Sequence, residues 1–235
     1  MAIANLRREY STGGLKRQDL TDDALAQFQS WFGQASGAQS GSRWRRIGIA
    51  LYKLWHAILG HEPVDVNAMV LATAAKDARP SARTVLVKGV DVRGFIFFTN
   101  YDSRKGQELA ENPAASLVFY WPELERQVCV AGTVSKLPHE ESEAYFKSRP
   151  KGSRLAAWAS NQSDVVADRD TLEKRWQEMA ARFLGDDVPL PPNWGGYVLA
   201  PARIEFWQGR PNRLHDRFRY SKQADGSWTI ERLAP

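Results

Sequence analysis

Short runs of β-branched and aromatic residues fill the middle of this chain and constrain its fold more than any other feature. The runs are NAMVLATAA, SARTVLVKGV, GFIFFTN, SLVFYW and RQVCVAGTVSKL, and all lie between residues 67 and 137. Turn-like segments and one helix-sized stretch separate them, without the regular strand–helix alternation that builds parallel sheets. The pattern predicts an antiparallel sheet that forms a barrel.

Helical periodicity appears on both sides of these runs. LTDDALAQFQSWF places Leu25, Phe28, Trp31 and Phe32 on one face, with Thr21 as its expected N-cap. HEESEAYFKSRP, SRLAAWAS and DTLEKRWQEMAARFLG follow the strands, and strands then resume with YVLAPARIEFWQG, RLHDRFRY and SWTIERLAP. Strands that resume after helices predict one α+β domain.

Charge and cysteine content narrow the function only slightly. The 32 Lys and Arg exceed the 27 Asp and Glu and give a formal net charge of +5, which suits any anionic ligand or surface. The single cysteine, Cys129, cannot form an intrachain disulfide, and no secretory signal is apparent, so we expect a cytoplasmic protein.

Several common motifs are absent from the sequence. The histidines lack metal-ligand spacing, and no nucleophile-elbow, Walker or Gly-rich dinucleotide motif occurs. The apolar stretch at 47–60 is too short to span a membrane.

Cationic and hydroxyl side chains gather near the ends of the predicted elements. In NYDSRKGQELAENP, Ser103 is the expected N-cap, and Arg104 and Lys105 occupy the first turn, where the helix dipole disfavours positive charge. A bound phosphate would remove that conflict. The alternative is a basic turn that faces solvent.

Two further groups of side chains could bind an anion, but their pattern is a less specific signal. Arg83 and Lys88 lie near the two ends of the apolar strand SARTVLVKG, as residues at the rim of a sheet also do. Tyr145 and Arg149 are four residues apart on a predicted helix, and Ser153 follows in an expected loop. A guanidinium with two hydroxyls can bind phosphate, but alone it is a weak signal.

The segment RLHDRFRY brings several basic residues close together. As a strand it places Arg213, His215, Arg217 and Arg219 on one face, where they repel one another. Trp207 comes into register with this face and could stack on a flat, phosphorylated ligand. A core tryptophan at a barrel corner is the alternative.

These segments together resemble one family, the pyridoxine (pyridoxamine) 5′-phosphate oxidases. LRREY, RTVLVK, FFTNYDSRK, ERQV, YFKSRP, NQS, IEFWQG, RLHDRF and ERLAP occur in the family's order, over residues 5–34 and 65–235. The resemblance implies an antiparallel FMN-binding split β-barrel of Greek-key type with flanking helices. It also implies a homodimer with FMN at the subunit interface and no nucleic-acid partner.

The implied reaction oxidises pyridoxine 5′-phosphate and pyridoxamine 5′-phosphate to pyridoxal 5′-phosphate, the last step of vitamin B6 cofactor synthesis and salvage. A hydride passes from C4′ to flavin N5, and O2 reoxidises the flavin to give H2O2. Two alternatives stay open. One is a split-barrel flavoprotein with another substrate, and the other is a non-catalytic protein that binds pyridoxal phosphate.

The resemblance also assigns site residues. The implied catalytic residues are Arg213, His215 and Asp65. The implied substrate contacts are Arg7, Arg8, Tyr10, Lys88, Tyr145, Arg149, Ser153, Arg213, Leu214 and His215. The implied FMN contacts are Arg83, Thr84, Val85, Leu86, Val87, Lys88, Phe98, Thr99, Arg104, Lys105, Gln127, Gln162, Ser163, Trp207 and Arg217. Phe98 stands where the family commonly has tyrosine. Residues 1–20 are implied to be a mobile segment that closes over the site, followed by a single domain at 21–235.

The stretch SGSRWRRIGIALYKLWHAILGHE, at about 40–62, falls outside the resemblance. Its apolar residues line one helical face and its basic residues lie largely off that face, which predicts an inserted basic amphipathic helix. Three interpretations stay open. The helix packs on the barrel or the dimer, it contacts a membrane surface or a protein partner through residues 43–59, or it is a grafted segment.

Overall fold

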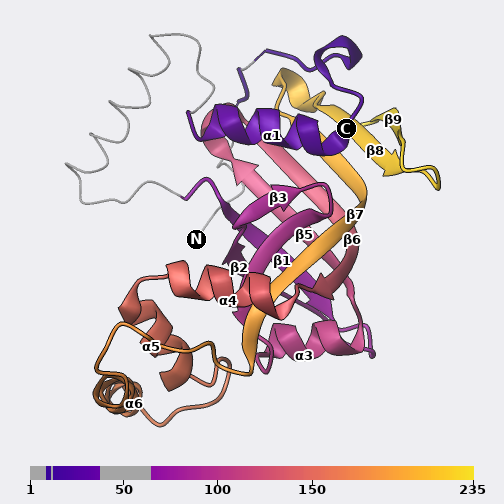
Figure 1. Cartoon of the computed structure of the whole chain (residues 1–235). Coiled ribbons are helices and arrows are strands. Elements are labelled where there is room, and N and C mark those ends of the chain that lie inside the picture. Colours follow the sequence, from indigo (N-terminus) through magenta and orange to yellow (C-terminus); the bar gives the residue numbers. More distant parts are fainter. Residues whose placement is uncertain (1–8, 12, 38–64) are drawn as a thin grey trace. The chain divides into compact units, whose positions relative to one another are not determined.

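The structure is a computed structural model that describes residues 9–11, 13–37 and 65–235 (Figure 1). The predicted helix at 40–62 and the predicted substrate contacts Arg7 and Arg8 lie outside the described residues. Those predictions therefore stay predictions.

Helices and strands occupy the order that the sequence indicates. The helices are α1 Ala24–Ala35, α3 Arg104–Glu111, α4 His139–Ser148, α5 Lys151–Ala159 and α6 Arg169–Arg182. The strands are β1 Ala68–Ala74, β2 Pro80–Leu86, β3 Gly89–Asp91, β4 Gly94–Asn100, β5 Ala114–Trp121, β6 Arg126–Lys136, β7 Trp194–Gln208, β8 Asp216–Lys222 and β9 Trp228–Leu233.

The strands belong to one sheet. Its order is β2-β1-β5-β6-β7-β4-β3, with β8 paired to β7 and β9 paired to β8. The pairs β3–β4, β4–β7, β7–β8 and β8–β9 are all antiparallel. The predicted antiparallel sheet and α+β class are confirmed.

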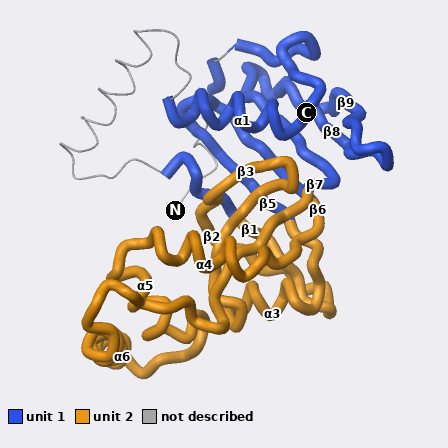
Figure 2. Tube along the Cα trace, viewed as in Figure 1, with its two compact units in different colours: residues 1–70, 116–131, 201–235 blue, residues 71–115, 132–200 orange. Residues whose placement is uncertain are grey.

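The chain divides into two compact units, which we describe separately (Figure 2). Unit 1 comprises residues 1–70, 116–131 and 201–235, and unit 2 comprises 71–115 and 132–200. Strands β1, β5, β6 and β7 each contribute residues to both units. Each unit has its own buried aromatic residues.

In unit 1, helix α1 supplies aromatic side chains to the core. Phe28 lies with its ring centroid 4.8 Å from that of Phe119, and Trp31 lies edge-on to Phe206 at 5.1 Å. The helix begins after Asp23, whose side chain accepts a hydrogen bond from Ala26 N at 2.7 Å. The prediction of Thr21 as N-cap is wrong, since a carboxylate two residues later caps the free N–H groups.

In unit 2, helix α3 is held very close to the segment before it. Ser103 is the N-cap, as predicted, and its hydroxyl accepts a hydrogen bond from Gly106 N. A Cβ on Gly106 would lie 2.0 Å from the carbonyl oxygen of Tyr101, so only glycine fits there. This contact fixes where the first turn of α3 lies.

The segment RLHDRFRY is only partly a strand, and the prediction of one continuous strand is wrong. A 3-10 turn covers Pro211–Arg213, and both Asn212 (φ 57°) and Arg213 (φ 62°) are left-handed. Strand β8 begins at Asp216. Arg213 and His215 therefore lie in the turn that precedes the strand.

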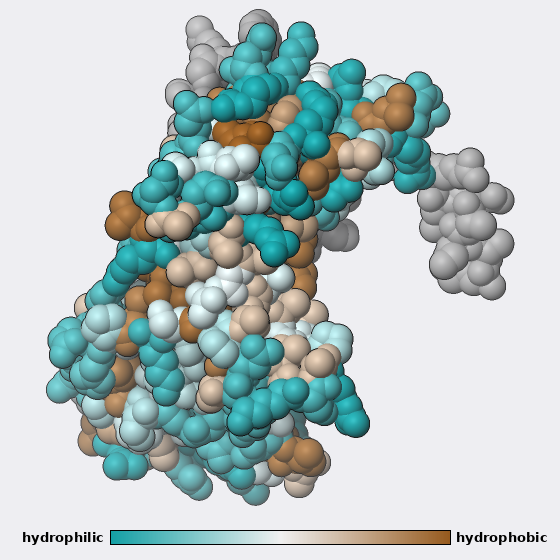
Figure 3. Space-filling model, turned by 90° about the vertical axis from the view of Figure 1, so that its right-hand side faces the viewer, coloured by the Kyte–Doolittle hydropathy of each residue, from teal (hydrophilic) through white to brown (hydrophobic). Residues whose placement is uncertain are grey.

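Some large apolar side chains are exposed on the described surface. Val92, Val165 and Leu184 are the most exposed large hydrophobic residues and come from three different segments. On the face in Figure 3, hydrophobic patches alternate with polar ones. None of the described helices is long and apolar enough to cross a membrane.

Candidate cofactor and substrate site

A cavity of about 800 Å³ opens in unit 2, a volume typical of small-molecule sites. It is lined by β2, the end of β4, the first turn of α3, the α4–α5 junction and the segment at 162–163. The predicted residues that line it are Arg83, Thr84, Val85, Leu86, Lys88, Phe98, Thr99, Arg104, Lys105, Tyr145, Arg149, Ser153, Gln162 and Ser163. Val87, which follows the last residue of β2, is buried and is not among the lining residues.

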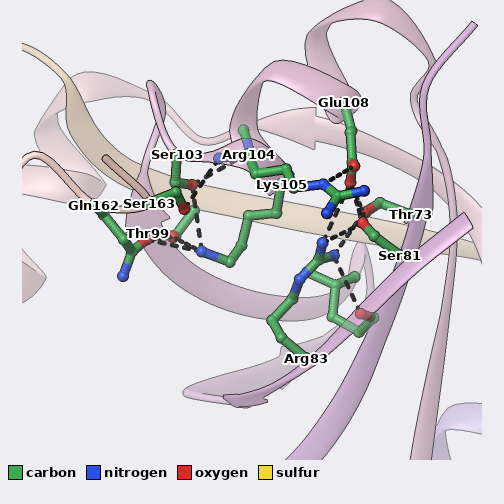
Figure 4. A network of polar contacts seen from close by, with 12 residues as sticks. Thr73, Ser81, Arg83, Thr99, Ser103, Arg104, Lys105, Glu108, Gln162 and Ser163 are labelled. Atoms are coloured by element: carbon green, nitrogen blue, oxygen red, sulfur yellow. Dashed lines mark hydrogen bonds and ion pairs between the residues drawn. The ribbon is translucent and has the colours of Figure 1, made fainter. Parts of the chain in front are cut away.

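Lys105 places a buried ammonium group at this cavity (Figure 4). Its Nζ donates to Gln162 Oε1 at 2.7 Å, Thr99 Oγ1 at 3.2 Å and Ser103 Oγ at 3.3 Å. These acceptors are all neutral. Burial, and then the positive charge of Arg83, lowers the pKa of Lys105 to about 8. A bound anion would stabilise its protonated form.

Beside Lys105, a second set of contacts surrounds Glu108 (Figure 4). Glu108 accepts hydrogen bonds from Arg83 and Arg104, and Arg83 also donates to Leu71 O, Thr73 Oγ1 and Ser81 Oγ. The backbone N–H of Arg104 donates to Ser163 Oγ at 3.3 Å. Lys105 is only 7% exposed, which excludes for this residue the alternative of a basic turn that faces solvent.

At the α4–α5 junction, Arg149 provides a second cation. Its guanidinium lies 4.6 Å from the ring centroid of Trp194. Its Nη1 is buried and has no hydrogen-bond partner in the described structure. Tyr145 lies on α4 and stacks on Phe98 at 3.8 Å. Burial lowers the pKa of Arg149 and raises that of Tyr145.

Ser153 lies near Arg149 on a helix, so its expected place in a loop is wrong. Helix α5 begins at Lys151, directly after Pro150, and Ser153 is in its first turn. Proline just before the first turn suits its fixed φ and its missing N–H. The cavity is thus lined by two sets of donors of the type that can bind phosphate: one around Arg104 and Lys105, the other around Tyr145, Arg149 and Ser153. These residues fit two phosphorylated groups.

In unit 1, neighbouring carboxylates neutralise the arginines of β8. Arg217 donates to both carboxylate oxygens of Glu205, at 2.8 and 3.1 Å, and to Ala234 O at 2.8 Å. Arg219 forms an ion pair with Glu231 at 2.8 Å. Trp207 lies directly opposite Arg217 in the β7–β8 register, as predicted.

His215 lies in an aromatic cluster in unit 1. Its ring centroid is 4.7 Å from that of Trp207 and 5.4 Å from that of Tyr10. Its Nδ1 accepts a hydrogen bond from Arg210 N–H at 3.1 Å, so the neutral ring carries its proton on Nε2. Burial, and then the charge of Arg213, lowers the pKa of His215. Both effects favour the neutral form of the ring, whose Nε2–H can donate a hydrogen bond.

The remaining predicted residues of unit 1 have fewer contacts. Gln127 donates to Cys129 Sγ at 3.3 Å. Asp65 is exposed, and its backbone carbonyl accepts from Ala68 N. Leu214 is 69% exposed and lines a smaller cavity with His215 and the C-terminal residues. Among the described residues, no group of three His, Cys, Asp or Glu side chains could bind a metal.

Two family models together match most of the described chain. The model for pyridoxamine 5′-phosphate oxidase matches residues 63–183, and the model for the pyridoxine 5′-phosphate oxidase C-terminal dimerisation region matches residues 194–235. The pyridoxine/pyridoxamine 5′-phosphate oxidase of Paraburkholderia phymatum is 53% identical over 233 residues, which cover 99% of both chains. The chain belongs to this family.

Solved structures include relatives with the same fold. PhzG from Burkholderia lata, solved in complex with tetrahydrophenazine-1-carboxylic acid, is 35% identical, with a TM-score of 0.70 over 80% of this chain and 92% of that one. A pyridoxamine 5′-phosphate oxidase-related, FMN-binding protein from Nostoc punctiforme is 20% identical, with a TM-score of 0.60 over 83% of this chain and 99% of that one. These similarities confirm the predicted split-barrel class.

Sequence reasoning missed several residues at the cavity of this oxidase-family chain. Ser81, Ala82, Pro150 and Trp194 line it, and Glu108 binds two of its arginines. A signal existed for Glu108, because it lies four residues after Arg104 on a predicted helix. No local pattern separates Trp194 from the other eight tryptophans.

Proposed function

We propose that this protein uses FMN to oxidise pyridoxine 5′-phosphate and pyridoxamine 5′-phosphate to pyridoxal 5′-phosphate. One observation carries the proposal: a single cavity holds two separate sets of phosphate-binding donors. An enzyme with a phosphorylated cofactor and a phosphorylated substrate requires both sets. Family membership supports the same reaction.

The two sets take different phosphates in this proposal. Arg104 and Lys105 bind the FMN phosphate at the start of α3, with Ser163 close to the Arg104 backbone. Tyr145, Arg149 and Ser153 bind the phosphate of the substrate. The buried Nη1 of Arg149 supports this assignment, since a buried charged donor is costly without an acceptor.

Arg213 and His215 orient the pyridine ring of the substrate. The Arg210 N–H fixes the His215 tautomer, so its Nε2–H donates to the substrate rather than accepting from it. Trp207 and Tyr10 hold the imidazole from two sides. These residues position the substrate, and none of them is required as a general base.

When bound, FMN would supply the acceptor for the hydride that leaves C4′ of the substrate, and O2 would be the final electron acceptor. The alcohol substrate loses two hydrogens, and O2 becomes H2O2. The amine substrate also takes up water and releases ammonia, so both substrates give pyridoxal 5′-phosphate.

The proposed assembly is a homodimer with FMN at the subunit interface. The match of residues 194–235 to the family's dimerisation region supports it. Analytical ultracentrifugation of the FMN-loaded protein should give twice the 26.5 kDa chain mass. A 26.5 kDa species with full flavin content would contradict the dimer.

A second candidate function is flavin-dependent oxidation of an unphosphorylated substrate. The likeness to PhzG favours it, because that protein was solved with a tricyclic carboxylic acid. The donors around Arg149 distinguish the two candidates. A phosphorylated substrate requires them, whereas the second candidate leaves them without a phosphate to bind.

Product formation tests the proposal. The FMN-loaded protein is given pyridoxine 5′-phosphate or unphosphorylated pyridoxine in air, and the matching aldehyde (pyridoxal 5′-phosphate or pyridoxal) and H2O2 are measured. We expect equal amounts of both products from the phosphorylated substrate, and a kcat/KM at least about tenfold lower for pyridoxine, as expected when a charged donor loses its acceptor.

Arg149→Ala separates binding of the substrate phosphate from binding of FMN. We expect it to raise KM for pyridoxine 5′-phosphate by roughly tenfold or more and to leave FMN content unchanged. Equal rates with and without the substrate phosphate would instead favour the second candidate function.

A further inference from the structure

A buried carboxylate contacts two of the cationic residues that line the unit 2 cavity. Glu108 is on α3, one turn after Arg104, and is 6% exposed. Buried carboxylates are rare unless they are paired and hydrogen-bonded. Glu108 has no place in the function proposed above, so its contacts require a separate explanation.

Each oxygen of Glu108 has its own donors (Figure 4). Oε1 accepts from Arg104 Nε at 2.9 Å. Oε2 accepts from Thr73 Oγ1 and Ser81 Oγ at 2.5 Å each, and from Arg83 Nη2 at 3.2 Å. One carboxylate therefore connects strand β1, strand β2 and helix α3.

The contact with Arg104 leaves the outer edge of that guanidinium accessible. Glu108 takes only Nε, and neither Nη of Arg104 has a hydrogen bond in the described part of the chain. Arg83 is held on several sides, since its Nη atoms donate to Leu71 O, Thr73 Oγ1, Ser81 Oγ and Glu108. Both guanidinium groups are thereby oriented before a ligand arrives.

The charge of the cluster suits a phosphate monoester. Arg83, Arg104 and Lys105 carry three positive charges and Glu108 one negative charge, which leaves a net charge of +2. A phosphate monoester carries about −1.5 to −2 at pH 7. Glu108 therefore reduces the repulsion among three close cations without cancelling the attraction for the ligand.

We propose that Glu108 is a positioning residue for the FMN phosphate, which orients Arg83 and Arg104 at the cavity. The inference rests on the proposed function, since it requires a phosphorylated flavin. Glu108 acts through the two arginines and does not touch the ligand.

The carboxylate keeps this role across the working pH range. Burial alone would raise the pKa of Glu108, but hydrogen bonds from Ser81, Thr73, Arg104 and Arg83 outweigh it and lower the pKa to about 2. A neutral amide at position 108 has only one acceptor oxygen. The NH2 group of that amide would face N–H or O–H donors that now bind the carboxylate. Glu108→Gln therefore removes the interaction that orients Arg83 and Arg104, while nearly preserving the size of the side chain.

The test compares two flavins that differ only in the phosphate. Apoprotein is titrated with FMN and with riboflavin, and flavin fluorescence gives both dissociation constants. Glu108→Gln should weaken FMN binding by roughly tenfold or more and riboflavin binding by less than about twofold. Glu111→Gln is the matched control, because Glu111 is exposed on the same helix and should leave both constants unchanged.

The outcomes separate this inference from the function it rests on. If Glu108→Gln weakens both flavins equally, or neither, Glu108 is only structural and the inference is overturned. Equal affinity of the wild type for FMN and riboflavin would overturn the proposed function and the inference with it. If Glu108→Gln does not fold, Glu108→Asp replaces it, since a side chain one methylene shorter cannot reach both arginines. An unchanged ratio of FMN to riboflavin affinity in that variant overturns the inference.

Discussion

At the scale of single residues, two cations at the cavity have no ion-pair partner in the described structure. Lys105 has only neutral acceptors, and the buried Nη1 of Arg149 has none. Keeping a charge away from water is costly unless an opposite charge lies nearby. The charge of Glu108 offsets part of this cost for Lys105, and a bound phosphate at each cation would offset more. These residues therefore link the geometry of the cavity directly to the proposed ligands.

The lowered pKa of Lys105, about 8, predicts a pH-dependent affinity for FMN. Below pH 8 the ammonium already carries its proton, so its charge attracts the phosphate fully. Above pH 8 the lysine of the free protein is neutral and must take up a proton on binding. We expect FMN affinity to fall by up to about tenfold per pH unit above 8.

Fluorescence titrations of apoprotein with FMN at pH 7, 8, 9 and 10 check this prediction. Lys105→Gln should bind FMN more weakly and lose the slope above pH 8. A wild-type affinity that is constant from pH 7 to pH 10 would contradict the role of Lys105.

Arg213 lies in the left-handed turn before β8, beside His215. Because it orients the substrate and not the flavin in our proposal, Arg213→Ala should lower kcat on the order of a hundredfold and leave FMN occupancy unchanged. Steady-state kinetics and the flavin-to-protein absorbance ratio measure the two effects. Arg219→Ala is the matched control, since that arginine pairs with Glu231 on β9. Equal loss of turnover and flavin would contradict the division of roles.

At the scale of elements, helix α3 combines three functions in two turns. Its N-terminal turn holds Arg104 and Lys105, its second turn holds Glu108, and Gly106 lets the helix approach the Tyr101 carbonyl. The helix dipole favours an anion at this end. The place of the first turn therefore decides where the phosphate donors lie.

Gly106→Ala should disturb this arrangement. Its new Cβ would overlap the Tyr101 carbonyl, so the free energy of unfolding should fall by about 1–3 kcal/mol. Urea unfolding measures the change. Gly152→Ala, in helix α5, is the control, because a Cβ on Gly152 meets nothing within 4 Å. In that variant the free energy of unfolding should rise by about 0.5–1 kcal/mol, since alanine favours a helix more than glycine does. An unchanged midpoint for Gly106→Ala would contradict the close contact.

The sequence predicted the positions of the helices and strands well, but it predicted the segments that join them poorly. Alternation of apolar residues located the strands, because it reflects burial of one face. It misread residues 213–215, since left-handed backbone at Asn212 and Arg213 leaves no mark on the alternation. Ser153 was expected in a loop, yet Pro150 precedes a new helix.

At the scale of the whole molecule, the cavity is built from distant parts of the chain. Arg83, Arg149 and Ser163 line it together although up to 80 residues separate them. Local pattern does not encode such contacts, and the resemblance to a known family supplied them. The sequence analysis did not predict the cluster around Glu108. The family motifs indicate which residues are expected to contact the ligands, but they do not indicate which residues orient those side chains.

The proposed reaction is tested most directly in a single turnover without oxygen. The FMN-loaded protein is mixed anaerobically with pyridoxine 5′-phosphate, and the absorbance of the oxidised flavin is followed. Our account predicts that this absorbance is lost, with one pyridoxal 5′-phosphate formed per flavin, and that it returns when air is admitted. A flavin that stays oxidised with pyridoxine 5′-phosphate bound would contradict it.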